Sequence, residues 1–326
     1  MNRDVTPLKA DQTLARHTDY RAYIAIARPD HWFKNVFVLP GVAVALAVGA
    51  EFSFATLVLL VTALLATGLI ASANYTINEY LDADSDRFHP VKSRRPSVLG
   101  RVDPGLVFLQ WALLSLFGLL LGFRLNASVG FTLVSLLVMG VVYNVRPMRS
   151  KDVAYLDVIS ESVNNPIRFL VGWFLLAPDI VPPASILLSY WMGGAFLMAV
   201  KRYAEYRFIG NAEVAADYRR SFAHYSENTL LQSAFLYAIL SSFFLGVFLV
   251  KYRIEFILSL PLFAMLFVWY LRLGMRRTSV VQTPEKLYRE RRFLAFVALL
   301  VVVVTLCFFV DVPWLEQIFL TTQAQA

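Results

Sequence analysis

Long apolar runs separated by polar segments dominate the chain. Scanning for stretches able to cross about 30 Å of hydrocarbon gives nine candidate spans, at residues 35–52, 54–77, 105–123, 127–145, 154–176, 184–203, 229–250, 254–272 and 293–311. This pattern predicts an all-α fold, a polytopic bundle of about nine transmembrane helices. The polar segments on one side are long, at 78–104, 204–228 and 273–292, whereas the loops on the other side have only a few residues. We therefore expect function to lie on the side of the long loops and in the bundle interior.

Composition supports a membrane protein. Of the 326 residues, 58% are hydrophobic and only 16% are charged, with a mean hydropathy of +0.59, outside the range of soluble globular domains. We expect a cytoplasmic tail at 1–24, one transmembrane catalytic domain at 25–312 and a short non-cytoplasmic tail at 313–326. The start of the chain lacks the apolar core of a cleavable signal peptide, and the single Cys307 has no partner for a disulfide within the chain.

The positive charges predict the orientation. With the N-terminus in the cytoplasm, Lys and Arg residues lie almost entirely on the cytoplasmic side; the exceptions are Arg124, Lys251, Arg253 and, inside a span, Arg168. Such asymmetry is typical of helices in a bacterial-type inner (plasma) membrane with the active site facing the cytoplasm. It accounts for the net charge of +7 without nucleic acid, and leaves membrane lipids as partners.

An acidic segment follows the second span. If the helix continues through it, Asn78, Asp82 and Asp86 recur at i, i+4 and i+8 on one face, with Glu79 beside them. A ridge of this kind repels itself unless water or a divalent cation is close, and carboxylate and amide oxygens suit Mg²⁺. We predict a Mg²⁺ site at these four residues; the alternative is a solvated helix end with scattered charge.

Basic residues follow at once and recur at the end of the sixth span. Lys92 and Arg95 come directly after the acids, as a magnesium-bound diphosphate would require, although positive-inside topology alone also explains them. Lys201 and Arg202 are further candidates for phosphate binding. Glu205 could hold a second metal or a sugar hydroxyl, or simply pair with Lys201 one turn away.

The fifth span carries charges that are expensive inside a membrane. Asp157, Glu161, Asn164 and Arg168 follow i, i+4, i+7 and i+11, so on one helix they fall within about 60° of each other. We expect one inward stripe lining a polar cavity, with Asp157 and Glu161 as catalytic candidates and Arg168 as a phosphate ligand. A structural Arg168–Glu161 pair is the alternative.

Three further polar residues lie near the ends of spans. Lys34 and Asn35 begin the first span and Tyr143 ends the fourth, so all three are candidate substrate contacts. Lys34 could instead be a membrane-boundary anchor. The chain has no HExxH, CxxC pair, GxxxxGK[ST] or GxSxG, so zinc hydrolysis, nucleotide-driven motors and serine hydrolysis lack their parts.

These motifs resemble a known family. The pattern Asn78-Glu79-x-x-Asp82-x-x-x-Asp86 resembles the NDxxDxxxD signature of the UbiA superfamily of intramembrane prenyltransferases, and the resemblance spans roughly residues 25–230. The neighbouring patterns are similar to the branch that contains decaprenyl-phosphate phosphoribosyltransferase: Arg28-Pro29-x-x-Trp32-x-Lys34-Asn35, Asp86-Arg87-x-His89-Pro90-x-Lys92-x-x-Arg95-Pro96 and Lys201-Arg202-Tyr203-x-Glu205. Two departures are visible: Glu79 replaces the usual Asp, and the second aspartate-rich motif of aromatic-substrate members is absent between spans six and seven.

The resemblance implies a nine-helix enzyme that moves a 5-phosphoribosyl group from phosphoribosyl diphosphate to a polyprenyl phosphate and releases diphosphate. The acidic motif would hold Mg²⁺ on the leaving group, the cations would neutralise phosphates, and Asp157 or Glu161 would stabilise an oxocarbenium-like ribose. One alternative is a prenyltransferase that uses a polyprenyl diphosphate on an aromatic or other small acceptor. Another is a non-enzymatic lipid or solute transporter.

Overall fold

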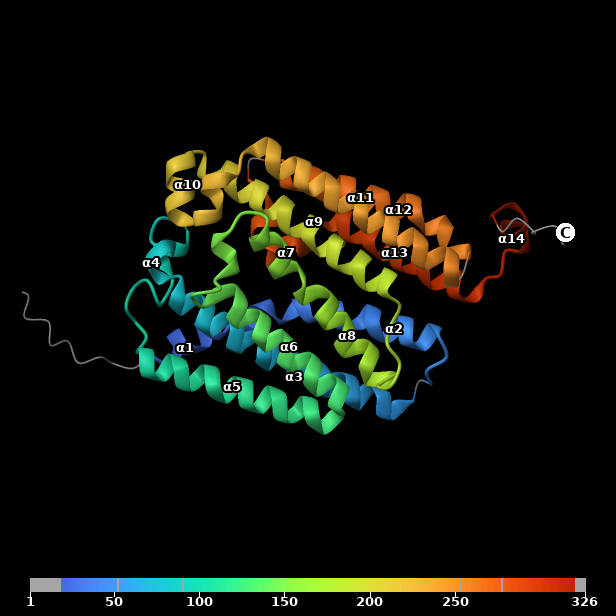
Figure 1. Ribbon diagram of the computed structural model, residues 1–326, viewed down its shortest axis with the longest axis horizontal. Helices are drawn as coiled ribbons and strands as arrows, with labels where there is room; N and C mark the ends of the chain where they lie inside the picture. Colours follow the sequence, from blue (N-terminus) through green and yellow to red (C-terminus); the bar gives the residue numbers. More distant parts are fainter. Residues whose placement is uncertain (1–18, 52, 90, 253, 277, 320–326) are drawn as a thin grey trace, which may run out of the picture.

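The computed structural model describes residues 19–51, 53–89, 91–252, 254–276 and 278–319. Within these ranges every regular element is helical, which confirms the all-α prediction. Figure 1 shows long helices running side by side, with α4 (Ala83–Asp86) and α10 (Ala212–Tyr218) at one end of the bundle and α14 (Pro313–Phe319) at the other.

The membrane-spanning segments match most of the predicted ones. Helical segments long and apolar enough to cross a membrane are α3 (Phe54–Leu81), α5 (Pro104–Leu125), α6 (Ala127–Asn144), α9 (Ala184–Ile209), α11 (Glu227–Tyr252) and the stretch Ile254–Gly274, which includes α12 (Leu260–Gly274). The other three predicted ranges hold α2 (Leu39–Ala47), the pair α7 (Leu156–Ser162) and α8 (Asn164–Leu176), and α13 (Arg291–Phe309). The chain is an integral membrane protein, and the total of about nine spans stays a prediction.

Polar caps decide where the long helices begin. Ser53 and Thr56 form a capping box at the start of α3, and Asp103 accepts hydrogen bonds from the first backbone N–H groups of α5, which starts at Pro104. Asn126 caps α6 in the same way through the N–H of Val129. The predicted starts of the second, third and fourth spans are therefore confirmed to within one residue.

Two helices expected to be continuous are interrupted. The predicted helix over 154–176 breaks at Val163, where Pro166 supplies no N–H for the carbonyl of Ser162. The expectation of one uninterrupted inward stripe was therefore wrong, because Asp157 and Glu161 belong to a different helix from Arg168. Likewise α3 ends at Leu81 instead of continuing through the acidic segment, and α4 begins after a turn at Asp82.

In the N-terminal region the chain changes direction at Arg28, which has a positive φ, and a new helix starts at Pro29. A short helix α1 (Tyr20–Ala27) ends at Arg28, whose positive φ redirects the chain into the 3-10 helix η1 (Pro29–Val38), and α2 follows. Residues 1–18 of the predicted N-terminal tail, residues 320–326 of the C-terminal tail, Pro90 and Arg253 lie outside the described residues.

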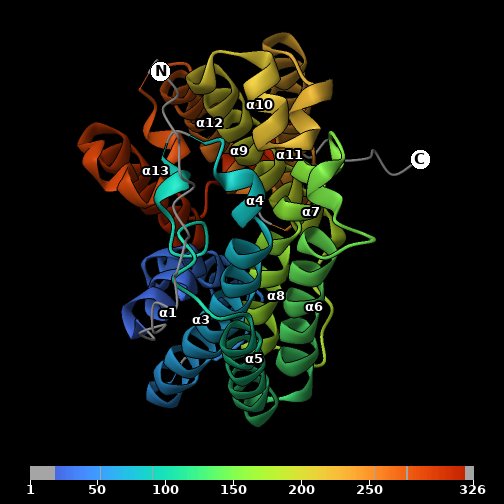
Figure 2. The same ribbon diagram turned by 90° about the vertical axis from the view of Figure 1, so that its left-hand side faces the viewer.

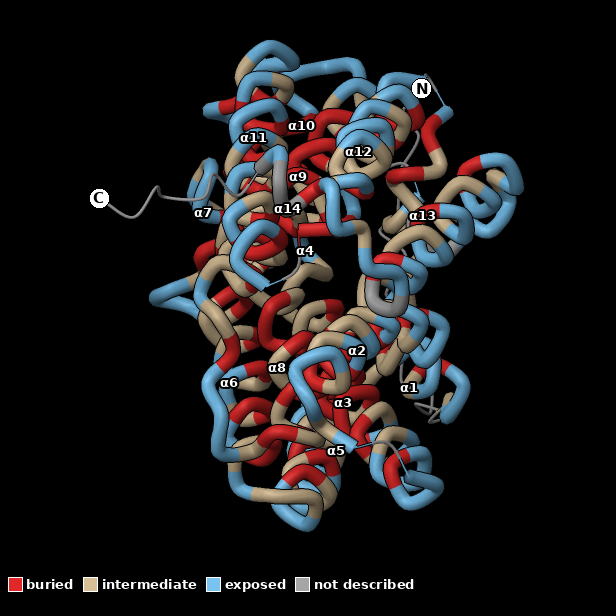
Figure 3. The backbone as a smooth tube through the Cα atoms, turned by 90° about the vertical axis from the view of Figure 1, so that its right-hand side faces the viewer, coloured by how far each residue is buried: buried red, intermediate tan, exposed pale blue. Residues whose placement is uncertain are grey.

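Apolar clusters hold the bundle together from the inside. One lies between α3, α6 and α8 around Leu133 and Val171, and another between α9, α11 and α12 around Phe196 and Leu273. Figure 3 shows buried residues on the inner sides of the helices and exposed ones around the perimeter. Large apolar side chains lie on that perimeter, such as Phe54 at 81% exposed, and in a membrane they would contact lipid tails.

Helices α2 and α8 cross at a contact that only glycine permits. A Cβ on Gly41 would lie 1.9 Å from the carbonyl oxygen of Phe169, and one on Gly172 would lie 2.0 Å from that of Val38. Close crossings of small residues are a common way to pack helices in membranes. This crossing holds η1 and α2 against α8, and with them one wall of the site described below.

We predict that Gly172→Ala lowers the free energy of unfolding by about 1–3 kcal/mol, because the added methyl group must push two backbones apart. The matched control is Gly246→Ala in α11, where a Cβ meets no atom within 4 Å. Thermal unfolding of both variants in detergent checks the prediction, and equal melting temperatures would contradict it.

Candidate active site

A polar cavity of about 840 Å³ opens at the end of the bundle that carries α4 and α10. Figure 2 faces this end, so α4 and α10 lie toward the viewer. The cavity walls come from η1, the end of α3, the loop before α7, α7 itself and the end of α9. The predicted site residues that line the cavity are Lys34, Asn78, Asp82, Asp86, Lys92, Arg95, Tyr143, Glu161, Lys201, Arg202 and Glu205. The other four, Asn35, Glu79, Asp157 and Arg168, are buried.

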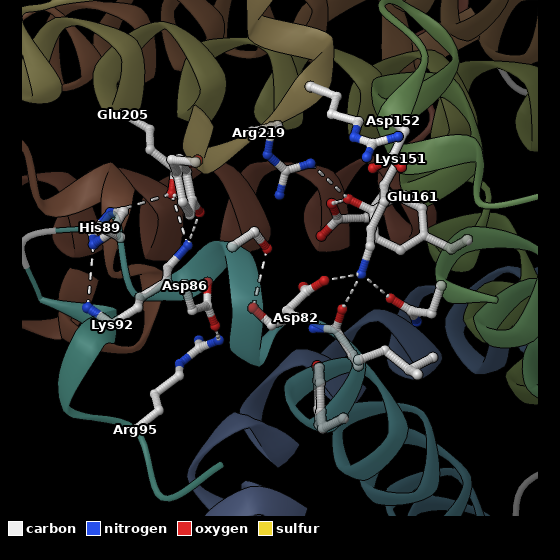
Figure 4. Close-up of a pocket in the computed structure, with 18 of the residues that line it drawn as sticks. Asp82, Asp86, His89, Lys92, Arg95, Lys151, Asp152, Glu161, Glu205 and Arg219 are labelled. Atoms are coloured by element: carbon white, nitrogen blue, oxygen red, sulfur yellow. Dashed lines mark hydrogen bonds and ion pairs between the residues drawn. The ribbon is translucent and has the colours of Figure 1, made fainter. Parts of the chain in front are cut away.

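Lys151 contacts the side-chain oxygens of Asn78 and Asp82, two residues of the acidic motif. Its ammonium lies 2.5 Å from Asp82 Oδ1 and donates hydrogen bonds to Asn78 Oδ1 at 3.0 Å and Asn144 Oδ1 at 2.8 Å (Figure 4). Burial lowers the pKa of Lys151 to about 8, although Asp82 opposes the shift. Burial by itself would raise the pKa of Asp82, but Lys151 and Arg149 outweigh burial and hold that pKa below its usual value.

Arg95 holds the other two acids. Its Nη1 is 2.5 Å from Asp86 Oδ2, and its Nε is 3.9 Å from Glu79 Oε2. Glu79 is 4% exposed, and its Oε1 has no hydrogen-bond partner among the described residues. The motif is thus divided at the turn into two pairs: Asn78 and Asp82 contact Lys151, with Arg149 also 3.0 Å from Asp82, whereas Glu79 and Asp86 share Arg95.

Lys92 bridges the loop after α4 to α9. Its ammonium lies 2.9 Å from Glu205 Oε1, which also accepts a hydrogen bond from Tyr218 at 2.8 Å. Burial disfavours the charged form of Lys92, yet Glu205 and Tyr218 outweigh burial and raise its pKa. The neighbouring His89 ring is 3.7 Å from Glu205; burial and the charge of Lys92 lower the pKa of His89 to about 4, so the ring is neutral at pH 7.

Arg202 joins three acids from two helices. Its guanidinium lies 3.1 Å from Asp157, 2.7 Å from Glu161 and 3.3 Å from Glu205. Tyr143 also contacts it, accepting from Nη2 at 3.0 Å and donating to Glu161 at 2.7 Å. Arg202 is 1% exposed, so its guanidinium is occupied by these carboxylates and is not available to bind a substrate directly.

The two candidate catalytic carboxylates differ in access. Asp157 is fully buried and accepts hydrogen bonds from Tyr225 at 2.8 Å and Ser221 at 3.1 Å, which ties the segment after α10 to α7. The Glu161 side chain is 23% exposed and faces the cavity. Of the two, only Glu161 can meet a substrate without rearrangement.

The remaining predicted residues lie around η1. Arg168 donates to Asn35 Oδ1 at 3.3 Å and to the carbonyl of Asn164 at 3.2 Å, and among the described residues it forms no ion pair with Glu161. Lys34 lies over the ring of Tyr75 at 5.6 Å. Lys34 and Lys201 both reach the cavity.

A divalent metal fits the acidic wall by the chemistry of its donors. Asn78, Asp82 and Asp86 present one amide and two carboxylates to the cavity, and Mg²⁺ in proteins commonly takes one or two carboxylates together with substrate phosphates and water. The described part of the chain has no group of three or more His, Cys, Asp or Glu side chains placed to hold a metal by itself. The donors therefore suit a metal that arrives with a phosphate ligand.

Two cations of the cavity, Lys151 and Arg219, are not among the site residues predicted from the sequence. Lys151 lies in a short loop between two predicted spans. Because positive-inside topology already accounts for a lysine there, nothing in the sequence marked it as a site residue. Arg219 lines the cavity, contacting Tyr143 at 3.3 Å and Asp157 at 3.8 Å. Only the packing of these loops against α3 and α7 shows their importance.

Comparisons with known proteins agree with this geometry. The profile of the UbiA prenyltransferase family matches residues 36–297. The decaprenyl-phosphate phosphoribosyltransferase of Mycolicibacterium smegmatis is 30% identical over 208 residues, which is 64% of this chain and 63% of that protein. The protoheme IX farnesyltransferase of Macrococcus caseolyticus is 27% identical over 209 residues, which is 62% of this chain and 67% of that protein. The match thus spans less than two thirds of the length of the phosphoribosyltransferase.

The fold is shared with solved structures. A UbiA homolog from Archaeoglobus fulgidus bound to GPP and Mg²⁺ superposes with a TM-score of 0.65, covering 89% of this chain and 100% of that chain at 21% identity. At this identity the likeness establishes the architecture alone.

The contrast between Asp157 and Glu161 yields a prediction. Asp157→Asn should lower the free energy of unfolding by about 3–5 kcal/mol, because it leaves part of the buried Arg202 charge without its partner. Glu161→Gln should cost less, since its side chain is partly exposed and Tyr143 can still donate to the amide oxygen. Denaturant unfolding of both variants in detergent micelles tests this, and a larger loss for Glu161→Gln would refute the assignment.

Proposed function

Since the chain belongs to the UbiA prenyltransferase family, we propose that it transfers a 5-phosphoribosyl group from phosphoribosyl diphosphate to a polyprenyl phosphate. The supporting observation is the charge distribution of the cavity. Where an aspartate-rich second motif would supply more acids, the end of α9 contributes Lys201, and Lys92 reaches in from the loop after α4; Arg202, also on α9, is occupied by three carboxylates. A cavity rich in cations suits a donor with several phosphates and an acceptor that also carries one.

The donor diphosphate would lie between the acidic motif and the cations around it. Lys92, Arg95 and Lys151 are each bound to a carboxylate in this structure, at 2.9, 2.5 and 2.5 Å. A diphosphate would draw these side chains toward its oxygens and free the acidic oxygens. Mg²⁺ held by Asn78, Asp82 and Asp86 would neutralise charge on the leaving group.

The reaction breaks the bond between ribose C1 and the diphosphate oxygen and forms one between C1 and an oxygen of the polyprenyl phosphate. As the first bond lengthens, positive charge develops on the ribose, and the Glu161 carboxylate is placed to stabilise it. Tyr143 and Arg202 fix that carboxylate through contacts of 2.7 Å each. The acceptor oxygen is already anionic at neutral pH, so the site needs no strong base. Diphosphate leaves with the bonding electron pair.

The main rival is a prenyltransferase that takes a polyprenyl diphosphate as donor. The similarity to protoheme IX farnesyltransferases favours it, and the acidic motif could serve either donor. We favour the phosphoribosyl reaction because Lys92, Arg95, Lys151 and Lys201 provide cations for the phosphates of both donor and acceptor, and we place the site on the cytoplasmic face of the inner membrane because of the Lys and Arg asymmetry.

Purified protein in detergent, given Mg²⁺, labelled phosphoribosyl diphosphate and polyprenyl phosphate, should produce a labelled lipid, and chelation of the metal should stop the reaction. Turnover of a polyprenyl diphosphate with no labelled lipid from phosphoribosyl diphosphate would sink the proposal in favour of the rival.

We further expect Asp82→Asn to reduce kcat by about 100-fold or more, because it weakens charge stabilisation of the leaving group. The melting temperature should fall as well, because the buried Lys151 ammonium loses its carboxylate, so kcat is measured on folded protein well below that temperature. Glu213→Gln, an exposed change in the first turn of α10, is the matched control and should keep full activity. Full kcat in Asp82→Asn would remove this residue from the leaving-group site, whereas substrate binding without Mg²⁺ and without turnover in the parent would favour a transporter or lipid-binding protein.

A further inference from the structure

Two sets of cations that line the cavity differ in their partners; Arg146 and Arg220, which also line it, are exposed. Lys92, Arg95 and Lys151 are each within 2.9 Å of a carboxylate. Lys34 and Lys201 line the same cavity but form no ion pair or hydrogen bond with any residue that the structure describes. Two ammonium groups thus stand without a counter-ion at the edge of an apolar bundle, where uncompensated charge is costly.

Glu161 does not supply the missing charge. It lines the same cavity as the two lysines, but its carboxylate is already bound by Arg202 and Tyr143 at 2.7 Å each. Lys34 and Lys201 also repel each other. This part of the cavity therefore carries excess positive charge and suits an anion separate from the one at the acidic motif.

The helix η1 that carries Lys34 has an apolar face on its other side. Trp32, Phe33, Val36 and Leu39 line a groove of about 450 Å³ against α3, where Val61, Leu64 and Leu65 form the opposite wall. Phe33 and Val36 are 44% and 52% exposed, so the groove opens at the lipid-facing perimeter.

Trp32 lies between the cavity and the groove. Its indole N–H donates to Ser72 Oγ at 2.8 Å, and its ring packs against Gly68. Along α3 the order is Tyr75 at the cavity, Ser72 and Gly68 under Trp32, then Leu65 to Val61 in the groove. From Tyr75 to Val61 this path measures about 21 Å at 1.5 Å per residue.

We propose that η1 is the seat of the lipid acceptor: a single-chain lipid phosphomonoester places its phosphate on Lys34 and Lys201 and its tail past Trp32 into the apolar groove. The assignment deepens the function proposed above and rests on it for the identity of the acceptor. It separates the two anions of the reaction, because the donor diphosphate takes the paired cations Lys92, Arg95 and Lys151. Glu161 lines the cavity that both sets of cations share, and it would stabilise the ribose carbon that changes partners.

Calorimetric titration of the purified full chain in detergent tests the seat without turnover. Dodecyl phosphate should bind, whereas dodecanol and inorganic phosphate should each bind at least about 10-fold more weakly, since each lacks one half of the ligand. Lys34→Gln and Lys201→Gln should weaken dodecyl phosphate binding about 10- to 100-fold, which corresponds to one lost charge-assisted contact. Their binding of pyrophosphate with Mg²⁺ should change less than about twofold.

Three variants keep the result interpretable. Lys201→Arg retains the charge and should bind dodecyl phosphate nearly as well as the parent, so a loss confined to Lys201→Gln is not a folding defect. Val36→Asp should weaken dodecyl phosphate but not pyrophosphate. Arg21→Gln, an exposed change in α1, should alter neither.

Two outcomes would overturn the inference. Weaker pyrophosphate binding with unchanged dodecyl phosphate binding in the Lys34 and Lys201 variants would assign these cations to the donor. Inorganic phosphate binding as tight as that of dodecyl phosphate would remove the groove from the site. Neither titration result depends on the identity of the donor. Turnover of a prenyl diphosphate would contradict the proposed function, whereas only the titrations test where the lipid phosphate binds.

Discussion

Charge placed inside an apolar bundle must meet its opposite, and Arg202 provides this for three carboxylates together. Its contacts with Asp157, Glu161 and Glu205 join α7 to α9, and Tyr225 and Ser221 add the segment after α10 through Asp157. One guanidinium cannot balance three carboxylates alone, and Lys92 beside Glu205 and Arg219 near Asp157 supply the remaining positive charge. The same contacts orient Glu161, the acid left facing the interior of the cavity.

The acidic wall follows the same rule in a form that a substrate can change. Lys151 and Arg95 occupy the oxygens that a metal would bind, so the resting site compensates its own charge with protein cations. A diphosphate arriving with Mg²⁺, as proposed above, would supply both partners, an anion for the lysine and arginine side chains and a cation for the carboxylates. Binding of metal and of diphosphate should therefore depend on each other, which explains how a motif of few acids can suffice.

The wall formed by η1 differs from the acidic wall, because Lys34 has no carboxylate partner among the described residues. The same helix also borders a groove at the perimeter of the bundle. Lys34 lines the polar cavity on one side of η1, while Phe33 and Val36 line the apolar groove on the other. The close crossing of α2 and α8 at Gly41 and Gly172 fixes this segment in place. An amphiphilic acceptor and a water-soluble donor could thus reach one reaction centre from two different phases.

The sequence alone determined the helical class, the starts of the second to fourth spans and the polar end of the bundle, because hydrophobic periods and helix caps are local signals. It also determined the acidic motif and the basic residues beside it. Only the tertiary structure decided which charges meet. The sequence favoured Asp157 and Glu161 equally, yet Ser221 and Tyr225, more than 60 positions away, bury the first and leave the second exposed. Likewise Lys151 joins Asn78 across 73 positions. Pairings of this kind depend on how helices pack, and no periodicity along one helix can reveal them.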